Sequence, residues 1–122
     1  MNYRITTTHR FDKELKRLGK KYKSMKQDYA CLLEELHNKP TEGVDLGEGF
    51  RKVRMAIASK NRGKSHGARV ITYLYAINEV EGNISLLSIY DKQEKDNISE
   101  AELRQLKAEI KTKVGITSNP VD

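Results

Sequence analysis

The sequence predicts an α+β domain, in which an N-terminal strand and a helical hairpin precede an antiparallel sheet and a C-terminal helix. Two features of the apolar pattern predict this order. Apolar residues recur every three or four positions before residue 40 and after residue 100, as in helices, and every second position from residue 50, as in strands. The 122 residues contain no repeat and no linker-like segment, so we expect a single domain over 1–122.

The first 40 residues carry the signals for a strand and two helices. Residues 2–7 are expected to form a short strand. The helix that follows should end near 19–21, and its apolar face is spaced by four, three and four residues, at Phe11, Leu15, Leu18 and Tyr22. Residues 24–27 have the S-x-x-Q form of a capping box, so a second helix should start there, bury Cys31 and stop at 38–40.

The middle of the chain changes from a helical period to an alternating one. Residues 41–49 contain several glycines and are expected to form a loop. The segment FRKVRMAIA at 50–58 should be a strand with Lys52 and Arg54 on the face away from the core. The next segment, SKNRGKSHG at 59–67, is expected to form a basic loop.

The last third of the chain completes the sheet and adds one helix. Two segments rich in β-branched and aromatic residues, 68–76 and 84–91, predict strands joined by a hairpin turn at 78–81. A second capping box at 99–102 predicts a helix with Leu103, Leu106 and Ile110 on its apolar side, and 113–122 are expected to be a loose tail. With all helices on one face of the sheet, the other face should be at least partly open.

Composition indicates a folded, basic protein. The hydrophobic fraction is 37%, the charged fraction 33% and the net charge +6, and the block from Arg51 to Arg69 has no acidic residue. Such a domain attracts polyanions, of which nucleic acid is the usual one. One cysteine allows no internal disulfide, and the sequence has neither a membrane-length apolar run nor a signal peptide, so we expect a cytoplasmic protein with no membrane partner. Three scattered histidines suggest no metal site, and we expect no cofactor.

The strand register predicts where the polar side chains of the open face meet. If 78–81 form a four-residue turn, Arg69 falls opposite Tyr90, Ile71 opposite Ser88 and Tyr73 opposite Leu86. Arg69, Tyr90 and Lys92 should then lie together, beside Lys52 and Arg54 of the neighbouring strand. This expectation depends on the turn length, because a slip of one residue turns every side chain of a strand to the other face.

These five residue types suit cleavage of RNA without a metal. In that reaction the 2′-hydroxyl attacks the adjacent phosphate, a base accepts its proton, and an acid protonates the leaving 5′-oxygen. Lys52 is the candidate base, Arg54 and Arg69 are candidates to hold the phosphate, and Lys92 or Tyr90 is the candidate acid. The alternative interpretation is a strand face whose charges are only solvated.

The basic loop supplies a second candidate surface. Lys60, Arg62 and Lys64 are predicted to contact RNA phosphates, which gives affinity without sequence choice. A solvated loop without a ligand is an equal alternative. His66 is expected to be solvated rather than catalytic, and Glu94 to pair with a nearby cation.

At these residues the chain resembles the RelE/ParE toxin superfamily, in particular its HigB-like branch. The similarity extends from about Phe11 to Leu106, and the segments that carry it are FDKELKRLGKKY, FRKVRMAIASKNRGKSHGARVITY and LLSIYDKQEKDNIS. It implies a RelE-like fold of the microbial RNase type, the cleavage of mRNA in the ribosomal A site with inhibition of translation, and a cognate antitoxin protein that binds the toxin.

The resemblance also bears on the site residues. The basic residues that act on the scissile phosphate in this superfamily correspond by position to Lys52, Arg54 and Arg69, and Lys92 stands where a basic residue often follows the last strand. The chain departs from the pattern in one respect: many relatives carry a tyrosine or histidines near the C-terminus, whereas no tyrosine follows Tyr90 and no histidine follows His66.

Two other functions remain open from the sequence. A ParE-like inhibitor that binds DNA gyrase without cutting RNA shares the fold, and a non-catalytic RNA-binding module or decayed toxin does too. The cationic cluster with Tyr90 discriminates between the RNA-cleaving enzyme and the gyrase inhibitor, because a gyrase inhibitor has no need of such a cluster.

Overall fold

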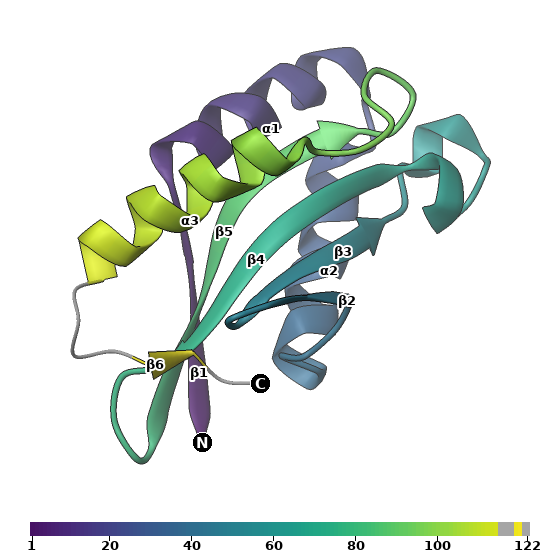
Figure 1. The fold of residues 1–122 in the computed structure, drawn as a ribbon. Coiled ribbons are helices and arrows are strands. Elements are labelled where there is room, and N and C mark those ends of the chain that lie inside the picture. Colours follow the sequence, from purple (N-terminus) through teal and green to yellow (C-terminus); the bar gives the residue numbers. More distant parts are fainter. Residues whose placement is uncertain (115–118, 121–122) are drawn as a thin grey trace.

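The computed structural model describes residues 1–114 and 119–120. Figure 1 shows one sheet with helices on both of its faces. The helices are α1 (His9–Lys21), α2 (Met25–Asn38) and α3 (Glu100–Val114), and the strands are β1 (Asn2–Thr7), β2 (Val44–Gly47), β3 (Phe50–Met55), β4 (Ala68–Ala76), β5 (Glu81–Asp91) and β6 (Asn119–Pro120). Two 3₁₀ turns, η1 (Ala58–Lys60) and η2 (Lys64–His66), lie in the basic loop. The predicted α+β order is confirmed.

The sheet is mixed, with the strand order β1-β5-β4-β3-β2. The first strand runs parallel to β5, and the other neighbours along this path are antiparallel. The helical hairpin carries the chain from β1 across one face of the sheet, which allows a parallel pair to form. Along the chain, the antiparallel strands β2, β3 and β4 come before β5.

Two segments differ from the sequence expectation. Residues 41–49 are not a loop throughout, because β2 forms within them and pairs with β3 through a turn that has positive φ at Gly47, Glu48 and Gly49. The expected tail at 113–122 begins later, because α3 continues through Val114. The backbone of Asn119–Pro120 pairs with the end of β4, and the rest of that tail lies outside the described residues.

The helices lie on both faces of the sheet rather than on one. α1 and α2 cover one face, where the buried core includes Phe11, Leu18, Leu32, Val53, Leu74 and Leu86. α3 crosses the opposite face, where it buries Phe50, Ile71, Tyr73, Leu87, Leu106 and Ile110. The expectation of an open face was therefore wrong for most of its area. What stays open is the end of this face beyond the first turn of α3.

The helix starts show which sequence signals act as caps. At α3, Ser99 Oγ accepts from the Glu102 amide at 3.1 Å while the Glu102 carboxylate lies near the Ser99 amide, so the predicted capping box forms. At α2, Ser24 makes no capping bond and donates instead to Asp28 at 2.7 Å. The capping prediction for residues 24–27 was therefore wrong in mechanism, although the helix starts where expected. Cys31, expected to be buried, is exposed.

β4 and β5 pair in two registers. At the site end Arg69 lies opposite Tyr90, as expected. Towards the turn Tyr73 lies opposite Ser85 rather than Leu86, and the Ile77 amide donates to Glu81, so the turn is one residue shorter than predicted. An extra residue in β5 shifts the register between the two halves. This bulge compensates for the shorter turn, and it keeps Arg69 and Tyr90 on the same face.

Candidate functional site

Four of the predicted site residues lie on neighbouring strands at the open end of the α3 face. Arg54 on β3 is the register partner of Arg69 on β4, and Arg69 is the partner of Tyr90 on β5. Lys52 precedes Arg54 by two residues, so the two side chains leave β3 on the same side. The structure therefore brings Lys52, Arg54, Arg69 and Tyr90 together, and we call them the cationic face.

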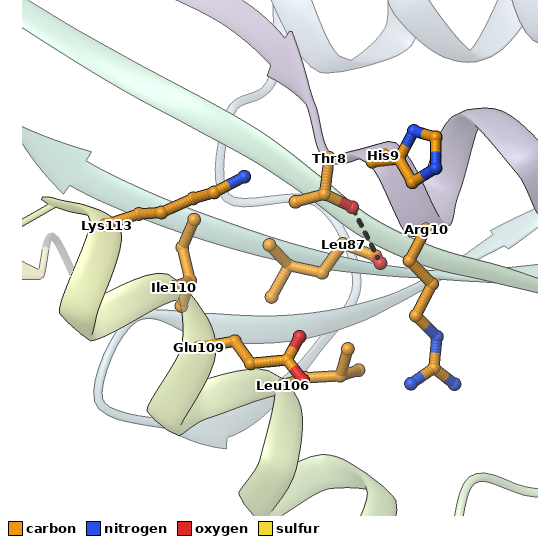
Figure 2. Close-up of a pocket in the computed structure, with 8 residues that line it drawn as sticks. All are labelled: Thr8, His9, Arg10, Leu87, Leu106, Glu109, Ile110 and Lys113. Carbon is orange, nitrogen blue, oxygen red and sulfur yellow. Dashed lines mark hydrogen bonds between the residues drawn. The ribbon is translucent and has the colours of Figure 1, made fainter.

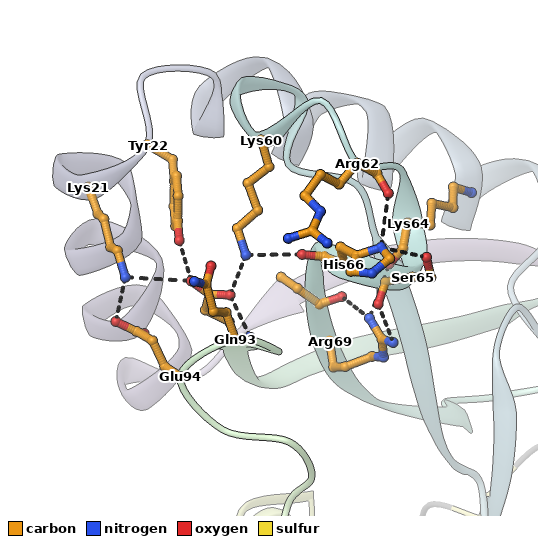
Figure 3. A network of polar contacts seen from close by, with 12 residues as sticks. Lys21, Tyr22, Lys60, Arg62, Lys64, Ser65, His66, Arg69, Gln93 and Glu94 are labelled. Atoms are coloured by element: carbon orange, nitrogen blue, oxygen red, sulfur yellow. Dashed lines mark hydrogen bonds and ion pairs between the residues drawn. The ribbon is translucent and has the colours of Figure 1, made fainter.

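Arg69 lies at the bottom of the cationic face and is only 4% exposed. Its guanidinium donates to the backbone carbonyls of Lys64 and Ser65 at 3.1 and 3.2 Å, and to its own neighbour Ala68 at 3.2 Å. Burial lowers the pKa of Arg69 from its ordinary value, and the adjacent Arg54 lowers it further. Arg69 thus fixes η2 to the sheet, and its charge lies beneath the surface rather than on it (Figure 3).

Lys52 and Tyr90 meet at Asn97, a residue that the sequence did not single out. The Lys52 ammonium donates to Asn97 Oδ1 at 3.1 Å, and the Tyr90 hydroxyl lies 3.4 Å from the same oxygen. Tyr90 is 5% exposed, and burial raises the pKa of its phenol. Tyr90 therefore remains a neutral hydrogen-bond donor at physiological pH. Asn97 had no sequence signal beyond its place between the last strand and the capping box.

Arg54 is the exposed member of the cationic face. It forms no hydrogen bond or ion pair with the residues that the structure describes, and it lies on the wall of a shallow groove of about 290 Å³. The groove is lined by Lys39, Glu42, Gly43, Val44, Lys52, Arg54 and Lys64. An exposed guanidinium in a groove with three lysines is an anion-binding arrangement.

Lys92 lies at the edge of this site. Its ammonium lies 3.3 Å from a carboxylate oxygen of Asp96, and its backbone amide donates to Gly67. It lines a second pocket of about 220 Å³ with Lys60, Arg62, His66 and Gln93 rather than the groove of Arg54. The structure therefore keeps Lys92 near the predicted cluster but directs it to the basic loop.

The three cations predicted to contact RNA have different environments. Lys60 does not lie at the tip of the loop, because its side chain is 8% exposed and its ammonium binds the buried Asp91 at 2.6 Å. That prediction is wrong for Lys60 as an exposed contact. Lys64 pairs with Glu35 of α2 at 2.9 Å and stays half exposed. Arg62 is exposed at the surface.

A polar network around Asp91 ties the basic loop to the sheet and to α1, and Figure 3 shows its members Lys60, Tyr22 and Gln93. Asp91 is fully buried and binds Lys60, the Tyr22 hydroxyl and the Gln93 amide. Burial raises the pKa of Asp91, but the hydrogen bonds from Lys60 and Tyr22 together outweigh it, so the net pKa is lowered. Next to it Glu94 pairs with Arg17 and Lys21, as the sequence predicted for this carboxylate.

A further pocket of about 250 Å³ lies between the start of α1 and the end of α3 (Figure 2). Leu87, Leu106 and Ile110 form its apolar part, and charged side chains such as Arg10 and Glu109 surround it. None of the four residues of the cationic face lines it. Its Arg10 is already paired with Glu14 and Glu102, whereas the cationic face holds an exposed Arg54 without an ion pair among the described residues, so we regard the cationic face as the better candidate site.

The fold and the site define a small basic α+β protein with a cluster of cationic side chains on one sheet face. The family model described as RelE toxin of the RelE/RelB toxin-antitoxin system matches residues 4–121. The chain therefore belongs to the RelE toxin family, which implies an antitoxin partner. A search of the curated proteins found no match. Within the described residues, no helix is both long enough and apolar enough to cross a membrane.

Proposed function

We propose that this chain is the toxin of a type II toxin-antitoxin pair and a ribosome-dependent endoribonuclease of the HigB-like kind. In the cytoplasm it would cleave mRNA bound in the ribosomal A site, without a metal, and so inhibit translation. The observation that carries the proposal is the cationic face, where an exposed Arg54 lies beside an amine and a neutral phenol that share one acceptor.

The reaction assigned to this face is attack of a ribose 2′-hydroxyl on the neighbouring phosphate. Arg54 binds the non-bridging oxygens, since its planar fork matches a phosphate and no described side chain competes for it. Arg69 adds positive charge from below while its donors hold η2. The charge that grows on the phosphate in the transition state is thus met by two guanidinium groups.

The proton transfers fall to Lys52 and Tyr90. Lys52 in its neutral form would accept the proton of the 2′-hydroxyl, and Tyr90, kept neutral by burial, would donate a proton to the leaving 5′-oxygen. The cationic face has no histidine–carboxylate pair, so its own acid–base groups are weak at neutral pH. Dependence on the ribosome follows if the decoding site supplies the missing alignment of the RNA.

The remaining cations of the site have supporting roles in this proposal. Lys92, together with Arg62 and Lys64, would contact phosphates of ribosomal RNA or of the flanking mRNA. Such contacts place the toxin on the ribosome without reading a sequence. Lys60 is assigned no RNA contact, because Asp91 holds its ammonium inside the fold.

The test is a cell-free translation reaction with a defined mRNA, in which 5′ ends are mapped by primer extension. Wild-type protein should cut at codon-phased positions only when ribosomes are present. Arg54→Gln should lose this cleavage, and Arg104→Gln on the exposed side of α3 should keep it. Intact mRNA with unimpaired translation would overturn the proposal, and a gyrase supercoiling assay would then test the ParE-like alternative.

A further inference from the structure

Asn97 occupies an unusual position between the two proton-carrying groups of the site. Its side-chain oxygen accepts from the Lys52 ammonium at 3.1 Å and from the amide of Ile98 at 3.0 Å, and it lies 3.4 Å from the Tyr90 hydroxyl. Lys52 and Tyr90 come from β3 and β5, which are not neighbours in the sheet. Asn97 therefore links side chains that β4 keeps apart.

The three donors fix the orientation of the Asn97 amide. An ammonium and a backbone amide only donate, so the group that faces them must be the carbonyl oxygen and not the NH₂. The NH₂ group consequently points away from them, and among the described residues it has no hydrogen-bond partner. It is free to donate to a phosphate oxygen that enters the site.

Asn97 is itself held in place by the segment that joins β5 to α3. The next residue, Ile98, is 8% exposed and packs in the core beneath α3, and Ser99 caps that helix. Lys95, earlier in the same segment, pairs with Glu102 of the first turn of α3. The start of α3 thus sets the position of Asn97.

We propose that Asn97 is a positioning residue of the cleavage site, which holds the Lys52 amine and the Tyr90 phenol in the geometry for proton transfer. This inference rests on the proposed endoribonuclease function. A neutral amide can orient an amine without adding charge, whereas a carboxylate at the same place would favour the charged ammonium of Lys52 and the neutral phenol of Tyr90. The amide therefore orients the candidate base without a second charge beside it.

The decisive variant is Asn97→Asp, because it retains the acceptor oxygen and the size of the side chain and changes only the charge. Single-turnover cleavage on programmed ribosomes should be measured as a function of pH, because the profile of rate against pH reports the essential acid and base. In Asn97→Asp the rising limb of the pH–rate profile should move to higher pH by about one unit or more. Asn2→Asp, at the exposed start of β1, makes the same change of charge elsewhere and should leave the profile in place.

A second variant separates positioning from folding. Asn97→Ala removes the acceptor and should lower the rate by at least about tenfold across the range, as expected for misplaced acid–base groups. Its urea midpoint should stay close to that of the wild type, because the side chain of Asn97 is exposed. A lower rate that is explained by loss of folded protein would count against positioning.

A measurement that does not need cleavage separates this inference from the proposed function. The side-chain carbon next to the Lys52 amine can be titrated by NMR in the wild type and in Asn97→Asp. If the wild type cleaves no RNA but the Lys52 titration moves in the variant, the proposed function fails and the contact stands. If the wild type cleaves, and neither the pH–rate profile nor the titration moves, the positioning role is overturned.

Discussion

Arg54 and Arg69 lie directly opposite each other on β3 and β4, with both side chains on the α3 face of the sheet. Like charges in opposed positions of antiparallel strands destabilise a sheet. Two features reduce the repulsion: Arg69 turns to the carbonyls of η2, and Arg54 extends towards solvent. The pair nevertheless opposes folding, and a bound phosphate would remove that opposition.

Replacing Arg54 should therefore stabilise the protein while it abolishes activity. Arg54→Gln removes one charge of the opposed pair and should raise the free energy of unfolding by about 0.2–1 kcal/mol. Urea unfolding monitored by circular dichroism at low salt gives this value, with Arg104→Gln as the matched variant that removes a charge without an opposed partner. A loss of stability in Arg54→Gln would show that the pair is not repulsive.

Protonation of the Asp91 carboxylate should lower the free energy of unfolding in acid. Its folded-state pKa is lowered, so the stability that it contributes is present above the pKa of the unfolded chain and is lost as pH falls through the folded pKa. The window thus lies below the ordinary aspartate value of about 3.9. The urea midpoint followed from pH 6 downwards should drop in this window for the wild type, by more than it does in Asp91→Asn.

At neutral pH the same substitution should be strongly destabilising. Asp91→Asn leaves the inward-pointing Lys60 without its counter-charge, and removal of one partner from a buried pair costs about 3–5 kcal/mol. Asp96→Asn is the control, since the Asp96 side chain is 93% exposed and its pair with Lys92 should be worth about 1 kcal/mol or less. Equal effects of the two variants would contradict the assignment of Asp91 as a buried anchor.

The two serines with the same capping pattern should respond differently. Ser99→Ala breaks a bond to the Glu102 amide and should cost about 0.5–2 kcal/mol, of which Ser99→Asp should restore most. Ser24 makes no such bond to its own helix, so Ser24→Asp should not support α2 and should instead repel Asp28. Urea midpoints of the three variants measure the difference, and recovery or gain of stability in Ser24→Asp would contradict it.

Arg62 and Lys60 of the basic loop should respond differently to substitution, the first as an RNA contact and the second as a structural residue. Arg62→Ala should weaken binding to ribosomes and reduce the slope of log affinity against log salt by roughly 0.7–0.9, as for one lost phosphate contact, with the fold unaffected. Lys60→Ala should instead lower the urea midpoint, because its ammonium fills the pocket beside Asp91. Ribosome sedimentation at several salt concentrations distinguishes them, and an unchanged salt slope for Arg62→Ala would rule out its contact.

Much of the fold could be predicted from the sequence because its signals are local. The α1 face from Phe11 to Leu18, the strand period after Phe50 and the capping box at Ser99 each act within a few residues. The location of α3 could not be predicted in this way, since its apolar side fits either face of a sheet. A signal did exist: β4 is largely apolar on both faces, which is typical of strands covered on both sides.

The pairing of Arg69 with Tyr90 was predicted correctly for an incomplete reason. The turn is one residue shorter than the sequence suggested, and only the bulge in β5 returns the strands to the predicted register. A bulge has no reliable sequence signal, because it depends on how the two layers of core side chains pack. For the same reason Lys60 and Asn97 could not be placed: both point where a tertiary contact directs them, to Asp91 and to Lys52.

The most direct test of the central claim is the chemistry of the cut. We would place a single 2′-deoxynucleotide on the 5′ side of the mapped cleavage position of an mRNA held in the ribosomal A site. If the cationic face activates the 2′-hydroxyl, the all-ribose mRNA is cut by the wild type and the substituted mRNA is left intact at that position. Cleavage of the deoxy-substituted position at the same rate would contradict the account.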